Sequence, residues 1–537
     1  MKKILVLALM IFLQACGLAL LDPNARNNQN PNTPNPNTPT PEGPTFTVGG
    51  TVSGLPRAFD LDGTINDLPY IFTENGTFTF PYDFADQTSY NVEIGTLPGG
   101  YTCVVNNGVG TIDGADVTDV EIVCSCIPDN AQIGDGTPSN PIEIWTATQL
   151  DSVATNPDCT VRQKHYKQMC DIDYTGINPT PIGSYGDAFT GSYNGQGFFI
   201  SNYTSGFNDA DHNDHKGLFG LTVSATLTDM NLSGFEIYPN ANMQDGNPAT
   251  GAIGALAAES QNTTIENIYV ENVLISANDT AMECVGGVIG NFWGQAPPGQ
   301  PKTAGINKMH VKDVEIHASL TMYVGGIIGG SLTDHALNRF IVGENLNVAS
   351  CYGLCGGLIG NLVTTSNADD PNGFIFVHIE NSSVEGNGEV GGLVGRLSGS
   401  VNRAAFEGTA RVTFNLSSAF SKRVGGLVGK IYSSSDMYNT LGIADVFSGS
   451  DVVFAGPAYG GTTGTPSFAA VTYLGGQTCE NCGANPLVSS QADVNTYYLG
   501  TDSSQTLNPL PWDTTYDWCL RPGMLPSLPQ VPFSLCQ

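Results

Sequence analysis

Basic residues are scarce in this chain of 537 residues: 19 lysines and arginines stand against 50 aspartates and glutamates, a formal net charge of −31. Such a surface repels nucleic acid and anionic headgroups, so we expect no nucleic-acid partner. Solubility is the simplest reason for the acidity, and divalent-cation binding is the alternative. Charged residues make up only 13% of the chain, whereas 65 residues are glycine. This composition favours strands and turns over helices.

Familiar catalytic motifs are missing too. The sequence contains no Gly-x-Ser-x-Gly elbow, no His-Glu-x-x-His pair and no phosphate-binding loop. We therefore assign no catalytic residue and expect a protein that is not an enzyme.

The N-terminus has the features of an export signal. Lys2 and Lys3 precede Ile4–Leu13, an apolar run of ten residues that is too short to span a bilayer but fits a signal peptide. The run ends in Leu13-Gln14-Ala15-Cys16, which resembles a bacterial lipobox. The resemblance implies a signal peptide over 1–15 and lipidation of Cys16; secretion with a free Cys16 is the alternative. Gly17 is not the Asp that implies inner-membrane retention, so we expect a lipid anchor in the outer membrane or at the cell surface of a Gram-negative bacterium.

Residues 16–45 are expected to form a tether. Beyond Ala25, residues 24–45 are rich in Asn, Pro and Thr and lack apolar side chains, so they cannot bury a core. The prolines stiffen such a segment towards polyproline II. A spacer of this kind would hold the folded part away from the membrane.

Short alternating runs follow from 46 to 125. Gly76–Phe80, Tyr90–Ile94 and Val120–Cys124 each alternate apolar and polar residues, which is typical of half-buried strands. About 80 residues of this kind predict a small β-sandwich. The segment resembles immunoglobulin-like repeat domains of bacterial surface proteins, and we predict a Cys103–Cys124 disulfide within it. Residues 126–140 are expected to be a linker.

A glycine box with near-constant spacing dominates the rest of the chain. Successive boxes begin 34, 36, 39, 31, 35 and 34 residues apart, which indicates a stacked solenoid. The seven copies are Gly217–Gly220, Gly251–Gly254, Gly287–Gly290, Gly326–Gly329, Gly357–Gly360, Gly392–Gly395 and Gly426–Gly429.

A second repeat lies between the boxes. Met230-x-Leu232-x-x-Phe235-x-Ile237 recurs from Ile268 and from Met309, and more weakly from Val377. Each half is a period-two pair with both side chains on one face. The two-residue interruption predicts a corner that keeps both apolar pairs pointing inward.

These repeats resemble those of GLUG-motif bacterial surface proteins, on the strength of VGGLVG at 390–395 and 424–429. Trp145–Leu150 is similar to the opening helix of that family, His165–Thr175 to its first strand, and Phe189–Gly197 to the next coil. The resemblance implies a right-handed parallel β-helix over 141–430 and an irregular end and cap over 431–537. We therefore expect an all-β chain, a small β-sandwich followed by this solenoid.

Few residues suggest a site. Asp209, Asp211 and Asn213 alternate like the first half of a calcium loop, but the remainder is absent, so a solvated loop is the simpler interpretation. Zinc binding through His212 and His215 lacks a third ligand. No other cofactor is expected.

Acidic pairs and cysteines give the remaining candidates. Asp171 and Asp173 could serve a glycosidase, but they match a turn. Cys479 and Cys482 have zinc or redox spacing, yet a disulfide is favoured in an exported protein. Further predicted pairs are Cys159–Cys170 and Cys519–Cys536, with Cys351–Cys355 conditional on a tight bend.

Two functions follow from these features. The first is adhesion or a structural role at the cell surface, binding an extracellular protein or glycan through the lateral face. The second is a carbohydrate-active, pectin-lyase-like enzyme on the same scaffold, because fold alone does not decide function.

Overall fold

The computed structural model describes residues 43–473, apart from gaps at 58, 98–99, 128–132, 206–214, 240–250, 279–280, 295–303, 334–337, 365–373, 413–421, 433–434, 448–453, 457–461 and 464–466. Within these residues the chain is nearly all β, with one α-helix and one 3-10 helix. It forms two compact units: one ends at Cys126 and omits Pro56–Ala58, and the other begins at Ile127. The predicted all-β class is confirmed.

The first unit is a small β-sandwich of two four-stranded sheets, with a short β1–β6 pair beside them. Tyr90 and Val92 alternate inward on β7, as Val120, Ile122 and Cys124 do on β10. One sheet contains, in order, β5 (Gly76–Thr79), β2 (Val48–Ser53), β10 (Val117–Cys126) and β8 (Tyr101–Asn106). The other contains β4 (Leu68–Phe72), β3 (Leu61–Ile65), β7 (Ser89–Ile94) and β9 (Val109–Thr111). The short pair is β1 (Thr45–Phe46) and β6 (Phe84–Ala85).

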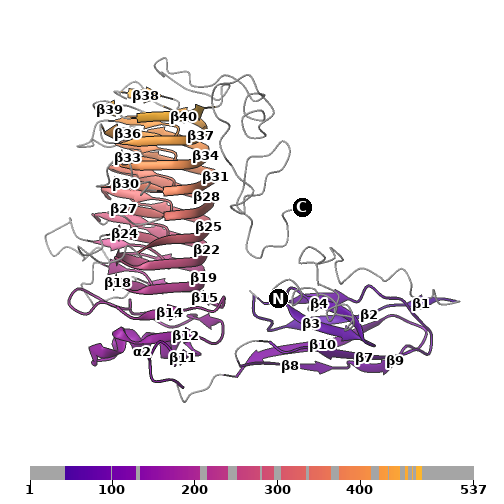
Figure 1. Ribbon diagram of the computed structural model, residues 1–537. Coiled ribbons are helices and arrows are strands. Elements are labelled where there is room, and N and C mark those ends of the chain that lie inside the picture. The colour runs from indigo at the N-terminus through magenta and orange to yellow at the C-terminus, as the bar shows by residue number, and fades with distance from the viewer. Residues whose placement is uncertain are drawn as a thin grey trace, which may run out of the picture. The chain divides into compact units, whose positions relative to one another are not determined.

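The second unit is a parallel β-solenoid built on three ladders of strands (Figure 1). The widest ladder contains β11 (Ile142–Ile144), β12 (His165–Gln168), β14 (Ser192–Asn194), β19 (Thr226–Ile237), β22 (Thr264–Ser276), β25 (Gly305–His317), β28 (Asn338–Cys351), β31 (Phe374–Gly386), β34 (Ser400–Val412), β37 (Asp436–Phe447) and β40 (Ser467–Tyr473). Its side branches are β13 (Ile172–Asp173), β15 (Phe199–Ser201) and β16 (Thr204–Ser205).

Two narrower ladders flank the glycine boxes. The one before the boxes contains β17 (His215–Lys216), β20 (Ala252–Ile253), β23 (Cys284–Gly286), β26 (Tyr323–Gly325), β29 (Leu354–Gly356), β32 (Glu389–Gly391), β35 (Arg423–Gly425) and β38 (Phe454–Gly456). The one after the boxes contains β18 (Phe219–Val223), β21 (Ala257–Gln261), β24 (Ile289–Trp293), β27 (Ile328–Thr333), β30 (Ile359–Thr364), β33 (Val394–Ser398), β36 (Val428–Tyr432) and β39 (Thr462–Thr463).

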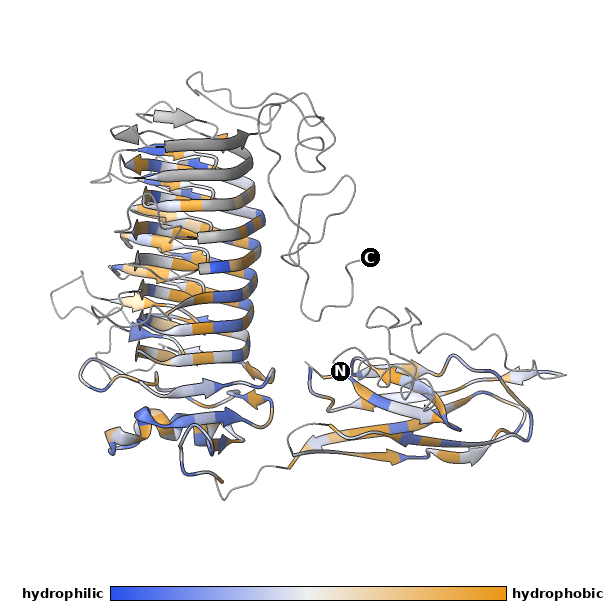
Figure 2. Ribbon diagram, in the orientation of Figure 1, coloured by the Kyte–Doolittle hydropathy of each residue, from blue (hydrophilic) through white to orange (hydrophobic). Residues whose placement is uncertain are grey.

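The predicted corner between apolar pairs is present inside the long strands. Its second residue has a left-handed backbone in each copy: Gly234 (φ 68°), Asn272 (φ 55°), Asp313 (φ 53°) and Asn381 (φ 48°). Glycine, asparagine and aspartate adopt this conformation most readily. The bend turns both apolar pairs inward, so Met230, Leu232, Phe235 and Ile237 are all buried. Hydrophobic and hydrophilic residues accordingly alternate along the strands (Figure 2).

The second glycine box is not where the sequence pattern placed it. Ala257 pairs with Ile289, and Leu256 N–H donates to Val288 O at 2.9 Å. Ala255–Ala258 therefore lies beside Gly287–Gly290, and the prediction of Gly251–Gly254 is wrong by four residues. Inward packing and ladder hydrogen bonds set the register, and alanine is small enough to occupy the box.

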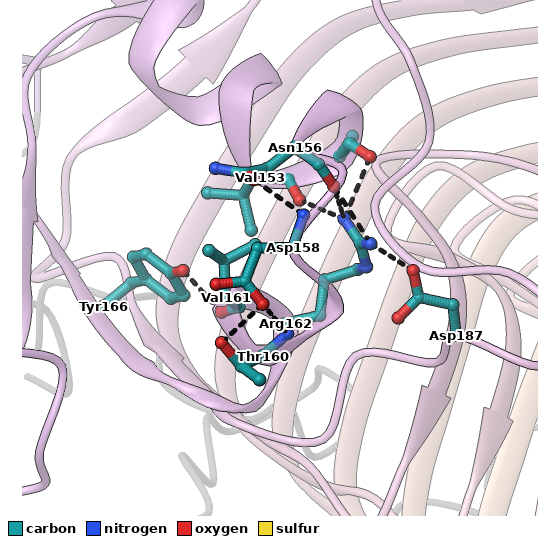
Figure 3. Close-up of polar contacts among 9 residues, drawn as sticks. Val153, Asn156, Asp158, Thr160, Val161, Arg162, Tyr166 and Asp187 are labelled. Carbon is teal, nitrogen blue, oxygen red and sulfur yellow. Dashed lines mark hydrogen bonds and ion pairs between the residues drawn. The ribbon is translucent and has the colours of Figure 1, made fainter.

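The solenoid is closed at its start by a helix, as the opening segment predicted. Helix α2 (Ala147–Thr155) begins where the Thr146 side chain accepts a hydrogen bond from Gln149 N, a typical N-cap. Its C-terminal carbonyls are bound by Arg162 from the 3-10 helix η1 (Cys159–Gln163). The guanidinium donates to Val153 O at 2.8 Å and to Asn156 O at 3.2 Å, and it pairs with Asp187 (Figure 3).

The ladders continue beyond residue 430, where the glycine boxes stop. Strands β37 and β40 pair in register with the strands before them, from Asp436 to Tyr473. Backbone pairing needs extended chain rather than the box itself, so the regular solenoid reaches further than the motif. The cap expected near the C-terminus lies outside the described residues.

Candidate functional site: a polar strip along the glycine boxes

Several residues singled out from the sequence lie outside the described residues, and the predictions about them stay predictions. They are Cys16, Asp209, Asp211, His212, Asn213, Cys479, Cys482, Cys519 and Cys536.

The described cysteines confirm two disulfides and contradict a third. Cys103 and Cys124 are bonded, directly opposite each other on β8 and β10. Cys351 and Cys355 are bonded across the bend between β28 and β29. The predicted Cys159–Cys170 pair is wrong. Cys159 begins the exposed 3-10 helix and carries a free thiol, whereas Cys170 is buried and belongs to another disulfide.

Asp171 and Asp173 act as turn residues, as the simpler interpretation of the sequence held. Asp173 accepts hydrogen bonds from Thr175 N at 2.9 Å and from Asn202 Nδ2 at 2.9 Å. Asp171 accepts one from Phe199 N at 2.8 Å. Their oxygens are used to hold successive coils together.

A different set of polar residues converges beside the glycine boxes. Where the chain turns at the boxes, side chains on the outward faces of the two flanking ladders come into contact, as Glu389 and Arg396 do. We call this line of contact the corner strip. One side carries His215, Ala252, Cys284, Tyr323, Leu354, Glu389 and Arg423. The other carries Leu221, Glu259, Asn291, Gly330, Asn361, Arg396 and Lys430.

One end of the corner strip is acidic and centres on Glu259. Tyr185 Oη donates to Glu259 Oε2 at 2.6 Å, His215 Nε2 lies 3.2 Å from the same oxygen, and Gln261 Nε2 donates to Oε1 at 2.7 Å. Burial alone would raise the pKa of Glu259, but these hydrogen bonds outweigh it and hold the pKa below its ordinary value. Tyr185 is well exposed, and its ring packs edge-on against His215 at 4.9 Å.

Glu283 lies beside the same cluster, but its pKa is shifted in the opposite direction. Burial, followed by the nearby negative charge of Glu259, raises the pKa of Glu283 above its ordinary value. Two carboxyl groups with opposite shifts can share acid and base roles. The neighbouring Cys284 is a free, buried cysteine, and burial raises the pKa of its thiol well above the ordinary value. That thiol is therefore not an activated nucleophile.

The other end of the corner strip is basic. The buried Glu389 carboxylate accepts from Arg396 Nε at 2.6 Å, and Lys430 Nζ lies 3.5 Å from its other oxygen. Both cations lie over the aromatic ring of Tyr432: Arg396 Cζ is 5.7 Å and Lys430 Nζ is 4.6 Å from the ring centre. Burial alone would lower the pKa of Arg396, but Glu389 outweighs it and the pKa lies above its ordinary value. Arg423 pairs in register with Glu389 on the next coil.

The corner strip was not predicted from the sequence, although a signal was present. The residues directly before and after each box supply it: Glu389 and Arg396 flank one VGGLVG, and Arg423 and Lys430 flank the next. The boxes themselves are apolar and repeat along the chain, whereas the residues that flank them vary and include the charged side chains.

Other ligand sites are sparse among the described residues. An open pocket beside β13 and β16 is lined by Tyr174–Asn178, Asn202 and Thr204, none of them an acid, a histidine or a cation. No group of three or more His, Cys, Asp or Glu residues suited to a metal occurs in the described part of the chain. Over the same residues, no helix is long and apolar enough to cross a membrane.

Comparison with known proteins gives limited similarity. No protein-family model matches the chain. Halomucin of Haloquadratum walsbyi is 31% identical over 170 residues, which is 29% of this chain and 2% of that protein. The chain thus spans a very small part of that relative's length. A crystal structure titled "putative immunoglobulin A1 protease", from Bacteroides ovatus, is 15% identical and covers 74% of this chain and 94% of its own, with a TM-score of 0.31.

Proposed function

We propose that the protein is an exported surface lipoprotein, anchored through Cys16, whose β-solenoid acts as an adhesion or structural module. Its partner would be an extracellular protein or glycan bound along the lateral face. The local similarity to halomucin supports a surface or structural role. Membership of the GLUG-motif group stays part of this proposal.

The observation that carries the proposal is the regularity of the ladders. Core positions repeat aliphatic residues from coil to coil, whereas an outward column of the widest ladder changes in charge and size: Glu236, Leu274, Glu315 and Asn347. Parallel coils stack about 4.8 Å apart, so such residues form a linear array rather than an enclosed pocket. Extended arrays of this kind are binding surfaces in solenoid proteins.

Attachment by cells tests the proposal. A strain lacking the protein would be compared with one complemented by the full chain and one carrying Cys16→Ser. Surface display is measured with an antibody before and after outer-membrane permeabilisation, and attachment with glycan- and matrix-coated plates. We expect attachment only with the lipidated, displayed chain. Equal attachment by the deletion strain and the complemented strain would contradict adhesion.

An enzymatic role is the second candidate, and it is favoured only by the acidic end of the corner strip. Glu283 and Glu259 are near each other and have pKa values displaced in opposite directions, as an acid and a base of a glycosidase would. Three hydrogen bonds to Glu259 argue for a structural role instead. Incubation of the chain and its Glu283→Gln variant with neutral and acidic polysaccharides decides: turnover lost in the variant would establish the enzyme.

A further inference from the structure

We propose that two exposed aromatic side chains at the acidic end of the corner strip, Tyr185 and Trp293, bind an uncharged polysaccharide. Two amide side chains beside them, Gln261 and Asn291, would hydrogen-bond the sugar hydroxyl groups. The inference rests on the proposed function as a surface binding module, and it names the ligand class and the residues that recognise it.

Exposed aromatic rings are rare in this molecule, and they occur together. Tyr185 is 63% exposed and Trp293 is 37% exposed, and every other aromatic side chain whose burial the structure describes is less exposed than these two. Both lie beside Glu259: Tyr185 Oη donates to its Oε2 at 2.6 Å, and Trp293 is the register partner of Gln261, whose Nε2 donates to its Oε1 at 2.7 Å. Exposed aromatic side chains gathered in one place are typical of binding surfaces.

The fold fixes the ring of Tyr185 before any ligand arrives. The ring projects from the tight turn Ser184–Asp187, whose end residues exchange two backbone hydrogen bonds of 3.0 and 3.1 Å. The buried Arg162 pairs with the last residue of this turn and anchors it (Figure 3). The hydrogen bond to Glu259 and the edge-on contact with His215 then set the direction of the ring. A side chain that is ordered in advance loses less conformational entropy on binding.

Trp293 and the two amides lie on one face of neighbouring strands. Asn291 and Trp293 project outward from β24 because Phe292 between them points into the core. Gln261 occupies the same position as Trp293 on the coil before it, about 4.8 Å away. The amides are partly exposed and can donate to and accept from hydroxyl groups, while an aromatic face packs against the apolar face of a sugar ring. These side chains therefore supply both kinds of contact that a saccharide needs.

The neighbouring charges favour a polysaccharide without charges of its own. Hydrogen bonds hold the pKa of Glu259 below its ordinary value, so this carboxylate is ionised at neutral pH. Glu283 is close enough to interact with that charge. A uronate or sulfate polymer would be repelled here by Glu259 and more widely by a chain of net charge −31.

The test measures binding of the full chain to three neutral polymers (dextran, galactomannan and xylan), to polygalacturonate and heparin, and to gelatin, at two salt concentrations. Tyr185→Ala and Trp293→Ala each remove one exposed ring, whereas Tyr185→Phe keeps the ring and removes its hydrogen bond to Glu259. Tyr238→Ala is the matched control, because Tyr238 also donates to a glutamate (Glu236 Oε2, 3.2 Å) but follows β19 on the widest ladder. Melting curves verify that each variant is folded.

We expect binding to at least one neutral polymer that changes little with salt, and weaker binding to the two acidic polymers. Affinity should fall roughly tenfold or more in Tyr185→Ala and in Trp293→Ala, less in Tyr185→Phe, and not in Tyr238→Ala. Full affinity in either alanine variant would overturn the inference. Binding to none of the neutral polymers, or to gelatin alone through the same rings, would overturn it too.

Attachment of cells separates this inference from the proposed function. If cells displaying the unaltered chain attach while the purified alanine variants keep full affinity for the neutral polymer, only this inference fails. If the purified chain binds a neutral polymer through the two rings but cells displaying it do not attach, the adhesion function fails instead.

Discussion

The glycine directly before a box, as at Gly286, Gly325 and Gly356, is a position where the solenoid tolerates little change. At Gly325, an added Cβ would lie 1.9 Å from Ile328 O, the carbonyl three residues further on, and 2.9 Å from Ile359 Cα on the next coil. The corresponding distances to the carbonyl oxygen are 2.0 Å at Gly286 and 2.2 Å at Gly356. Both neighbours of Gly325 are backbone atoms, so no side chain can rotate away.

The cost of Gly325→Ala can be worked from these distances. Ordinary contact begins near 3.4 Å, so relief needs about 1.5 Å of backbone movement (3.4 − 1.9). That movement would stretch the ladder hydrogen bonds from Ile328 N to Leu358 O (2.9 Å) and from Gly326 N to Gly356 O (3.0 Å). Overpacking costs about 1–3 kcal/mol, and each lost hydrogen bond about 1 kcal/mol. We expect the free energy of unfolding to fall by about 3–5 kcal/mol.

Gly330→Ala is the matched control, five residues along the same coil. Its new Cβ would meet only side-chain atoms: Cys284 Sγ at 3.0 Å, and Asn291 Oδ1 and Tyr323 Cδ2 at 3.5 Å. We expect a change within about 1 kcal/mol, since reduced freedom of the unfolded chain offsets a slight crowding. Urea unfolding followed by circular dichroism, with hydrogen exchange of β26 and β27, measures both variants. Equal loss in the two, or none in Gly325→Ala, would refute the reasoning.

Three further predictions follow from single residues. Arg162→Met should destabilise the start of the solenoid by about 3–5 kcal/mol, because loss of the buried cation leaves the helix carbonyls and Asp187 without their hydrogen-bond donor. Hydrogen exchange should become faster in α2 and β12, and unchanged exchange would contradict this prediction. Burial lowers the pKa of His378 to about 4, so between pH 6.5 and 4 the unfolded chain binds a proton that the folded chain does not, and stability falls with falling pH. His378→Leu should remove about 3 kcal/mol of that pH-dependent loss of stability, whereas substitution of the partly exposed His317 by Leu, the control, should not. Urea unfolding of both variants at pH 6.5 and pH 4 measures the difference. Mass spectrometry of the N-terminal peptide should find Cys16 lipidated, and an unmodified start at any other residue would exclude it.

Much of the architecture could be predicted because it follows from local periodicity. The apolar pairs separated by two residues predicted a corner, and each described copy places a left-handed residue there. The Cys103–Cys124 pair followed from the resemblance of the segment to a sandwich and is present. The box register at Ala255–Ala258 could not be predicted, because alanine does not stand out as glycine does.

The candidate site was not predicted, since it depends on which residues a tight turn brings face to face. Glu389 and Arg396 are seven residues apart and meet only because the box between them folds the two ladders together. Glu259 and His215 are 44 residues apart and lie on successive coils. No spacing rule links such positions until the register is known.

The sequence by itself determined that this chain forms an all-β solenoid behind a small sandwich, because strand alternation, corners and glycine boxes act between near neighbours. The tertiary structure alone decided which polar side chains meet, that Cys159 does not pair with Cys170, and where the ladders stop following the motif. The physical reason is that these features depend on contacts between coils about 35 residues apart along the chain, where a shift of a few residues in register exchanges every partner.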